Sequence, residues 1–329
     1  MAQRGHIQET DRRRSAMLRT AFCPVVREAL GRADTLEVMV NPDGSVWVET
    51  AGRGLIAAGH TLDACDRERV IRLIASTTGG GPDAAIVSAE LPGSGERFEG
   101  VLPPVSPAPC YAIRKPAARP FTLDDYVRQG ALTPALADAM RQLIAGRANI
   151  VIAGGTSSGK TSFANALLAE SGLAGDRIVL LEDTRELACP AANHVALRTQ
   201  PGRASLRDLV RSTLRLRPDR IIVGEVRGAE ALDLLKAWST GHPGGITTLH
   251  ASSAAGALRR LEQLTLEAIP RAPSELIADA VDVVVFMSRA GGTRRVDEAV
   301  RVTGFDGQDY RTRPLLPPSL SLVTQGDMT

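Results

Sequence analysis

A glycine-rich segment that contains a single lysine is the strongest chemical signal in this sequence. Residues 154–161 read Gly-Gly-Thr-Ser-Ser-Gly-Lys-Thr and match the phosphate-binding pattern G-x-x-x-x-G-K-[ST] in full. In such loops the backbone N–H groups point at the β-phosphate of a nucleotide, and the lysine bridges the β- and γ-phosphates. An apolar strand pattern, 150–153, precedes the segment, and a helix-compatible run, 162–170, follows it. The sequence therefore predicts a nucleotide-binding loop between a strand and a helix.

The side chains of this loop have separate predicted tasks. Lys160 stands out in a chain whose basic residues are almost all arginine, and a compact ammonium fits between two phosphates where a planar guanidinium does not. The Thr161 hydroxyl is the expected ligand of Mg²⁺. The predicted ligands are ATP and Mg²⁺, and the predicted nucleotide-binding residues of the loop are Gly154, Gly155, Thr156, Ser157, Ser158, Gly159, Lys160, Thr161 and Ser162.

An acidic residue that ends a second apolar strand is the candidate for activating water. Glu225 follows the run 221–224, which is where P-loop ATPases place the carboxylate that orients or deprotonates water. The position before it is Gly224, whereas many P-loop enzymes have a magnesium-orienting Asp there. The metal must then rely on Thr161, phosphate oxygens and water. The alternative for Glu225 is an acidic residue that merely ends a strand.

A third apolar strand, 178–181, ends in another acidic cluster that begins with Glu182. Because the carboxyl ends of parallel strands face the ligand crevice, Glu182 is expected to order magnesium-bound water or to assist Glu225. The alternative interpretation is a helix-capping Asp183 beside solvated acids.

Two histidines flank the predicted strand 246–249. His250 follows the strand and would donate to the γ-phosphate or to water, so that it reports whether the triphosphate is intact. A core or capping histidine is the alternative for His250, and this alternative has more weight for His242, which precedes the strand.

Arginines recur at helical spacing at positions 207, 211 and 215. Like charges four residues apart destabilise a lone helix, so an acidic group is expected to face them. We expect that group to be carboxylates of a neighbouring subunit or a nucleotide phosphate supplied across an interface. A solvated face partly balanced by Asp208 and Asp219 is the alternative. Arg114 and Arg128 are further candidates for reaching the phosphates.

The arrangement of strands and helices predicts two domains, as does a length of 329 residues. Strand patterns at 36–40 and 45–49 flank the turn Asn-Pro-Asp-Gly, and helices are expected over 11–30 and 62–74. Further strands are expected near 84–91, 97–102 and 110–114. After the proline-rich stretch, short apolar strands alternate with helices, which is typical of a parallel sheet covered on both faces. The predicted divisions are an α+β domain (1–114), a linker (115–121), an α/β P-loop domain (122–310) and a loose tail (311–329).

Composition excludes several functional classes. A net charge of +2 and only 6 Phe, 3 Tyr and 2 Trp disfavour nucleic-acid binding through bulk charge or base stacking. The 4 cysteines are widely spaced, which favours a reducing cytosol over a disulfide framework. The chain has no apolar leader pattern and no apolar run of membrane-spanning length, so we expect a soluble or peripheral membrane protein. The tetrapeptide N-K-x-D of GTPases and the L-S-G-G-Q segment of ABC subunits do not occur.

Several segments together carry a family resemblance: NPDGSVWVE, RFEGVLPPV, YAIRKPA, GGTSSGKTS, LEDTREL, LVRSTLRLRPDRIIVGEVRG and AWSTGHPGGITTLHA. Over residues 35–304 the chain resembles the TrbB-type conjugal-transfer secretion ATPases within the type IV secretion and type IV pilus superfamily. The resemblance implies a hexameric ring ATPase on the cytoplasmic face of the inner membrane, peripheral to it, that works with secretion-channel proteins. It also implies a RecA-like P-loop domain, a smaller N-terminal domain, and nucleotide bound between the two.

The resemblance assigns roles to segments of this chain. The Asp box of the family corresponds to 182–186, the Walker B segment to 221–225 with Glu225 catalytic, and the His box to 241–250. A glycine before the catalytic glutamate is normal in the family. Arg114, within YAIRKP, corresponds to arginines of the N-terminal domain that contact phosphates in relatives. Ser157 and Ser162 depart from the residues most frequent there, but backbone amides and Thr161 make the main contacts.

Three other functions stay open at this point. A pilus assembly or retraction motor of the same superfamily would use the same chemistry. A nucleotide-gated structural ring would bind ATP but rarely cleave it. A DNA helicase would share the RecA-like core, although the few aromatic residues and the low net charge weigh against it.

Overall fold

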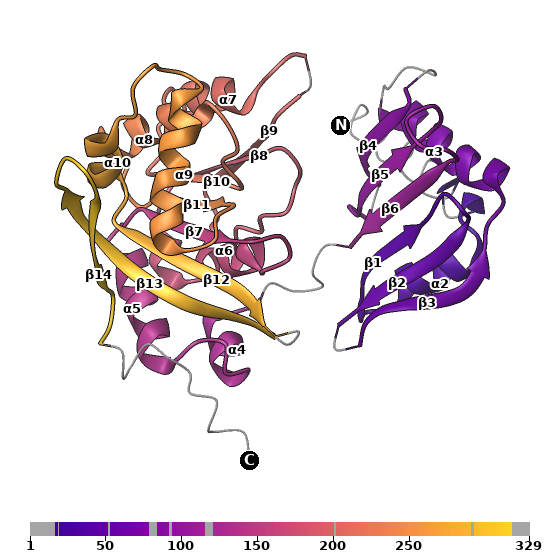
Figure 1. Cartoon of the computed structure of the whole chain (residues 1–329), viewed down its shortest axis with the longest axis horizontal. Coiled ribbons are helices and arrows are strands. Elements are labelled where there is room, and N and C mark those ends of the chain that lie inside the picture. The colour runs from indigo at the N-terminus through magenta and orange to yellow at the C-terminus, as the bar shows by residue number, and fades with distance from the viewer. Residues whose placement is uncertain are drawn as a thin grey trace. The chain divides into compact units, whose positions relative to one another are not determined.

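The chain folds into two compact units, Met1–Arg119 and Pro120–Thr329, in a computed structural model (Figure 1). The structure describes residues 17–18, 20–51, 53–78, 84–91, 94–115, 121–200, 202–290 and 293–317. Residues 116–120, in the middle of the expected linker, lie outside the described part. Lys115, which was also expected in the linker, belongs to the smaller unit, because its backbone N–H donates to Leu36 O and its Nζ to Leu30 O and Arg32 O.

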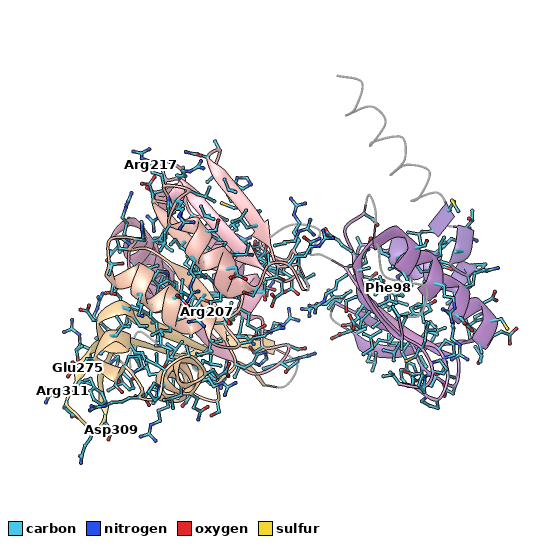
Figure 2. All side chains as sticks on the ribbon, turned by 90° about the horizontal axis from the view of Figure 1, so that it is seen from above. Phe98, Arg207, Arg217, Glu275, Asp309 and Arg311 are labelled. Carbon is cyan, nitrogen blue, oxygen red and sulfur yellow. The ribbon has the colours of Figure 1, made fainter. Side chains whose placement is uncertain are left out.

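The smaller unit is an antiparallel sheet with helices. Its elements are α2 (Pro24–Gly31), β1 (Thr35–Val40), β2 (Ser45–Thr50), β3 (Gly54–Thr61), α3 (Ala64–Thr78), β4 (Ile86–Glu90), β5 (Arg97–Val101) and β6 (Cys110–Arg114). The strand order is β3-β2-β1-β6-β5-β4, and every neighbouring pair is antiparallel. Its core includes Phe98, labelled in Figure 2, with Ile71 and Ile113, all fully buried. The predicted α+β class of this half is confirmed.

Two local predictions in the smaller unit need correction. The single helix expected over 11–30 is interrupted, since Cys23 is extended (φ −64°, ψ 160°) and α2 begins at Pro24. Proline disfavours helical geometry in the residue before it but suits the first turn of a helix, which explains the break. Residues 1–16 and 19 lie outside the described part. Strand β3 was missed because its apolar and glycine residues do not alternate, and it forms by pairing with β2.

The larger unit is a sheet between two layers of helices. Its helices are α4 (Leu123–Arg128), α5 (Pro134–Ala145), α6 (Lys160–Leu168), η1 (Ser171–Leu173), α7 (Leu206–Thr213), α8 (Glu230–Ser239), α9 (Ala254–Leu266) and α10 (Ser274–Ala280). Its strands are β7 (Ile150–Gly154), β8 (Ile178–Glu182), β9 (His194–Arg198), β10 (Arg220–Val223), β11 (Ile246–Leu249), β12 (Val283–Ala290), β13 (Thr293–Phe305) and β14 (Tyr310–Pro314).

The sheet order in this unit is β14-β13-β12-β7-β11-β10-β8-β9. Strands β7 to β12 run parallel, and β13 and β14 add an antiparallel extension. Alternate residues of β7 enter two separate cores. Ile150 and Ile152 pack with α4, α5 and α6, whereas Val151 and Ala153 pack with α7, α8 and α9. A parallel sheet with both faces covered requires this alternation. The predicted α/β class of this half is confirmed.

The C-terminal end of the larger unit differs from the expectation. Residues 311–314, assigned to a loose tail, form part of β14, which pairs with β13. Tyr310 anchors the start of that strand, because its hydroxyl donates to Glu262 of α9 at 2.8 Å. The prolines of the sequence suggested a tail, but an edge strand tolerates them because one side of its backbone needs no partner. Residues 318–329 lie outside the described part.

Candidate functional site

The predicted phosphate loop connects β7 directly to α6. Gly159 is the N-cap of α6 and has φ of 97°, a left-handed geometry that favours glycine. A Cβ at Gly154 would lie 2.4 Å from the carbonyl oxygen of Met287, so only glycine fits there. Ser157 adopts φ of 59°, which turns the loop around the start of the helix. These residues place a glycine-rich turn at the N-terminus of a helix, where backbone N–H groups favour phosphate.

Lys160 lies on this loop and is 8% exposed. Its Nζ donates to the carbonyl oxygens of Gly154 at 3.1 Å and Gly155 at 3.0 Å. A buried ammonium has to be hydrogen-bonded, and here the loop itself supplies acceptors.

His250 lies between the lysine and the candidate base. Its Nε2 is 3.4 Å from Lys160 Nζ and 2.9 Å from Glu225 Oε1. Burial, followed by the charge of Lys160, lowers the pKa of His250, and the nearby Glu225 only partly opposes that shift. The imidazole is therefore neutral at pH 7, so it is able to donate from one nitrogen and accept at the other.

Glu225 itself has an unequal pair of carboxylate oxygens. Oε2 accepts from Arg227 Nη2 at 2.5 Å. Oε1 is buried and has no hydrogen-bond partner among the residues that the structure describes, although His250 Nε2 is near it. Arg227 also lies 4.0 Å from Asp183 and joins the two acidic segments. One carboxylate oxygen is thus held by a cation and the other is left for a donor such as water.

The buried side chain of Glu182 lies next to the backbone of Gly224. Glu182 is 3% exposed, and its Oε1 accepts from the backbone N–H groups of Glu186 at 2.8 Å and Leu187 at 2.7 Å. Burial raises the pKa of Glu182, and the two N–H groups partly offset this. A Cβ at Gly224 would lie 3.2 Å from Glu182 Cγ. The Glu182 side chain therefore crowds position 224, and a larger residue such as Asp would make a tight contact with it.

Two residues that the sequence suggested as site residues, His242 and Arg114, do not lie beside Lys160, His250 and Glu225 within the larger unit. His242 precedes β11 while His250 follows it, so the two lie at opposite ends of one strand. Arg114 is the last residue of β6 in the smaller unit, where it is exposed and opposes Glu37 of β1. Its predicted contact with phosphate stays a prediction.

The arginine stripe has its acidic partner inside the same chain. Asp233 of α8 accepts from Arg207 Nε at 2.7 Å and from Arg211 Nε at 3.0 Å. Figure 2 labels Arg207 on the larger unit. Helix α7 ends at Thr213, so Arg215 is not on the helix. The expectation that a neighbouring subunit or a phosphate neutralises this stripe is wrong for Arg207 and Arg211.

The balancing role considered for Asp208 is met in part, because the pKa of Asp208 is lowered first by its hydrogen bonds with Ser205 and then by the charges of Arg211 and Arg207. Asp208 accepts from Ser205 in a capping box at the start of α7, and Asp219 accepts from the backbone N–H of Arg177. Helix packing of α7 on α8 adds Asp233 as the acid that both arginines contact, which the spacing of arginines in one helix does not reveal.

Sequence reasoning missed two arginines near the site. Arg227 follows Glu225 by two residues, and this short spacing was a signal for an ion pair. Arg294 of β13 lies over the phosphate loop, where its Cδ is 2.9 Å from the position of a Cβ at Gly159. No local pattern indicated Arg294, because its hairpin was not expected.

The strand–loop–helix arrangement, with a carboxylate at the end of a neighbouring strand, can be compared with known proteins. The family model "Type II/IV secretion system protein" matches residues 82–295. The chain belongs to this family. It is 49% identical over 288 residues to a conjugal transfer protein TrbB from Rhizobium radiobacter, covering 86% of this chain and 88% of that protein. The resemblance to conjugal-transfer and type IV secretion ATPases is thereby confirmed.

Solved structures support the fold. The ATPase DotB of Legionella pneumophila has a TM-score of 0.60 at 22% identity, covering 84% of this chain and 79% of that one. The pilus retraction motor PilT, solved with bound ADP, has a TM-score of 0.61 at 18% identity, covering 84% and 80%. The larger unit is a RecA-like P-loop domain and the smaller an N-terminal α+β domain, as expected. Within the described residues, every helix is too short or too polar to cross a membrane.

Proposed function

We propose that this protein hydrolyses ATP to ADP and phosphate with Mg²⁺ and thereby drives assembly or substrate transfer in a conjugative type IV secretion system. The observation that carries the proposal is that His250 Nε2 lies 3.4 Å from Lys160 Nζ and 2.9 Å from Glu225 Oε1. A phosphate-binding lysine, a neutral imidazole and a partly unpaired carboxylate are the groups that phosphoryl transfer to water needs.

Each group has a distinct task in this proposal. Lys160 exchanges its two loop carbonyls for β- and γ-phosphate oxygens. Glu225 Oε1, which has no hydrogen-bond partner among the described residues, accepts from the attacking water and orients it. Neutral His250 donates to the γ-phosphate or to that water. Glu182 supports Glu225 from the neighbouring strand. The remaining residues of the loop, Gly154, Gly155, Thr156, Ser157, Ser158, Gly159 and Ser162, bind phosphates mainly through their backbone amides.

The residues near the loop fit a magnesium ion. Thr161 lies in the first turn of α6, and the buried hydroxyl oxygen Ser158 Oγ has no hydrogen-bond partner in the described part of the chain. Hard oxygen donors of this kind suit Mg²⁺, which keeps most of its water. Thr161 would hold the ion, and Glu182 would accept from its water. When bound, the ion would supply positive charge that neutralises the phosphates.

The oligomer and its location are part of the same proposal. A hexameric ring, peripheral to the inner membrane on its cytoplasmic side and bound to secretion-channel proteins, is what the identity to a conjugal transfer protein supports. Arg114 of the smaller unit would then reach the phosphates as a further nucleotide-binding residue. Specific nucleic-acid binding is not part of the proposal.

Two alternatives have specific support. A pilus assembly or retraction motor is one alternative, since a pilus retraction motor has the same fold. The ion pair of Glu225 with Arg227 favours a nucleotide-gated structural ring with little turnover, because it occupies one oxygen of the proposed base.

The test is steady-state phosphate release together with nucleotide binding. Wild type should turn over ATP, and Glu225→Gln should lose about 10²–10⁴-fold in rate while still binding ATP. Lys160→Ala should lose binding itself. Absence of turnover in both wild type and Glu225→Gln, with ATP bound to each, would favour the structural ring. Native mass with and without nucleotide then measures the oligomer.

A further inference from the structure

The strands on the two sides of β7 place different side chains near the phosphate loop. On one side, β11 and β10 bring His250 and Glu225 to the end of Lys160, and this side faces the terminal phosphate. On the other side, β7 pairs with β12, which forms a long hairpin with β13 (Figure 1). The α6 and β12–β13 side of the loop is thus the side away from His250 and Glu225.

Arg294 lies at the start of β13, on that side. A Cβ at Gly159 would be 2.9 Å from Arg294 Cδ, 3.6 Å from Cγ and 3.7 Å from Cβ, so the aliphatic part of the arginine lies along the N-cap of α6. The side chain is half-buried. Within the described residues, the guanidinium of Arg294 has no ion pair and no hydrogen bond to another side chain. Arg294 is therefore held beside the phosphate loop although no described acidic side chain pairs with it.

The aliphatic part of Arg294 contacts Gly159, the N-cap of α6. The guanidinium is close enough to Tyr126 that its charge opposes the rise in pKa that burial causes in that phenol. Tyr126 packs edge-on against Phe163 of α6, with 5.3 Å between ring centroids. Arg294 is thus beside the N-terminus of α6, where helix N–H groups also favour an anion.

The next arginine behaves differently. Arg295 Nε pairs with Asp297 at 2.5 Å on the same strand. Because successive side chains of a strand point to opposite faces, Arg295 points away from the loop. Only one arginine of this pair is therefore left for a ligand.

We propose that Arg294 is a nucleotide-binding residue whose guanidinium binds the α-phosphate of the nucleotide. The inference rests on the proposed nucleotide site. An arginine presents a planar pair of N–H donors that match two phosphate oxygens, and no described acid competes for them. The γ-phosphate is on the Glu225 side of β7, so a contact from β13 is made equally to ATP and ADP.

Titration of nucleotide binding in wild type and variants tests this. Arg294→Met keeps the aliphatic contact over Gly159 and loses the charge. It should raise the Kd for ATP and for ADP by the same factor, about tenfold, because one charge-assisted contact is lost from both. Arg294→Lys should recover most of the affinity. Arg295→Ala is the matched control and should bind both nucleotides as wild type does.

The outcomes separate the inference from the proposed function. If wild type binds neither nucleotide, the proposed function fails. If wild type binds both and Arg294→Met binds equally well, the proposed function stands and the inference is wrong. A loss confined to ATP would place Arg294 at the γ-phosphate, and a changed preference for ATP over GTP would place it at the base. Either result overturns the α-phosphate assignment.

Discussion

His250 Nε2 and Glu225 Oε1 lie 2.9 Å apart, although the two residues follow different strands, β11 and β10. The same nitrogen faces Lys160 Nζ at 3.4 Å. The imidazole is thus placed between a cation and an acid, and its charge decides which of them it attracts. Burial and Lys160 lower the pKa of His250 and keep it neutral at pH 7.

This arrangement predicts a loss of stability in mild acid. Because the unfolded chain has a histidine pKa near 6.5 and the folded pKa is lower, unfolding takes up a proton below about pH 6.5. The free energy of unfolding should therefore fall as the pH drops through that value. Urea unfolding at pH 7.5 and pH 5.5 measures it, and His250→Gln should lose less stability than wild type does.

His242→Gln is the matched control for this experiment, because His242 precedes β11 at the opposite end. It should keep the pH dependence of wild type. An identical pH dependence in His250→Gln and wild type would contradict the prediction.

Glu182→Gln should slow ATP turnover without lowering the free energy of unfolding. Burial raises the pKa of Glu182, so its ionised form is disfavoured in the folded protein above about pH 4.5, and that cost is present at pH 7. The amide oxygen of Gln would still accept from Glu186 and Leu187. We expect equal or slightly higher stability at pH 7, within about 1 kcal/mol, and slower ATP turnover.

Glu182→Ala would leave those two backbone N–H groups without their acceptor. We expect it to lower the free energy of unfolding by about 1–3 kcal/mol, measured by urea unfolding at pH 7. If Gln destabilises as much as Ala does, the charge of Glu182 rather than its acceptor geometry stabilises the segment, and the interpretation is wrong.

The glycines of the phosphate loop offer a matched pair of variants. A Cβ at Gly154 would lie 2.4 Å from Met287 O, whereas a Cβ at Gly155 has no heavy atom within 4 Å. Gly154→Ala should lower the free energy of unfolding by about 1–3 kcal/mol, because β12 must shift. Gly155→Ala should leave it within about 0.5 kcal/mol. Thermal unfolding compares the two, and equal effects would show that the loop accommodates a side chain at Gly154.

Asp233 should stabilise helix α7 by offsetting the charges of Arg207 and Arg211. Asp233→Asn removes the acid that Arg207 and Arg211 share, at 2.7 and 3.0 Å. Since these arginines are partly exposed, we expect a loss of only about 1 kcal/mol in unfolding free energy, and 1 M salt should abolish the difference. A difference that does not respond to salt would mean that the contact is not mainly electrostatic.

The phosphate loop and the acidic strand ends were predictable because their information is local. A turn of glycines, the lysine and the strand and helix around them are all adjacent in the chain, and the observed β7 and α6 begin at or near the expected residues. Strands β9, β13 and β14 were not expected. Their residues alternate weakly, and they form because a neighbouring strand offers hydrogen bonds.

The amino-acid sequence by itself therefore determined the class of chemistry: a phosphate loop, a carboxylate at Glu225 and a parallel sheet to hold them. Only the tertiary structure decided which groups meet. His250 lies between Lys160 and Glu225, Glu182 fills the space beside Gly224, and Arg294 covers Gly159. These contacts join segments that are far apart along the chain, and strand order and helix packing, rather than local spacing, bring them together.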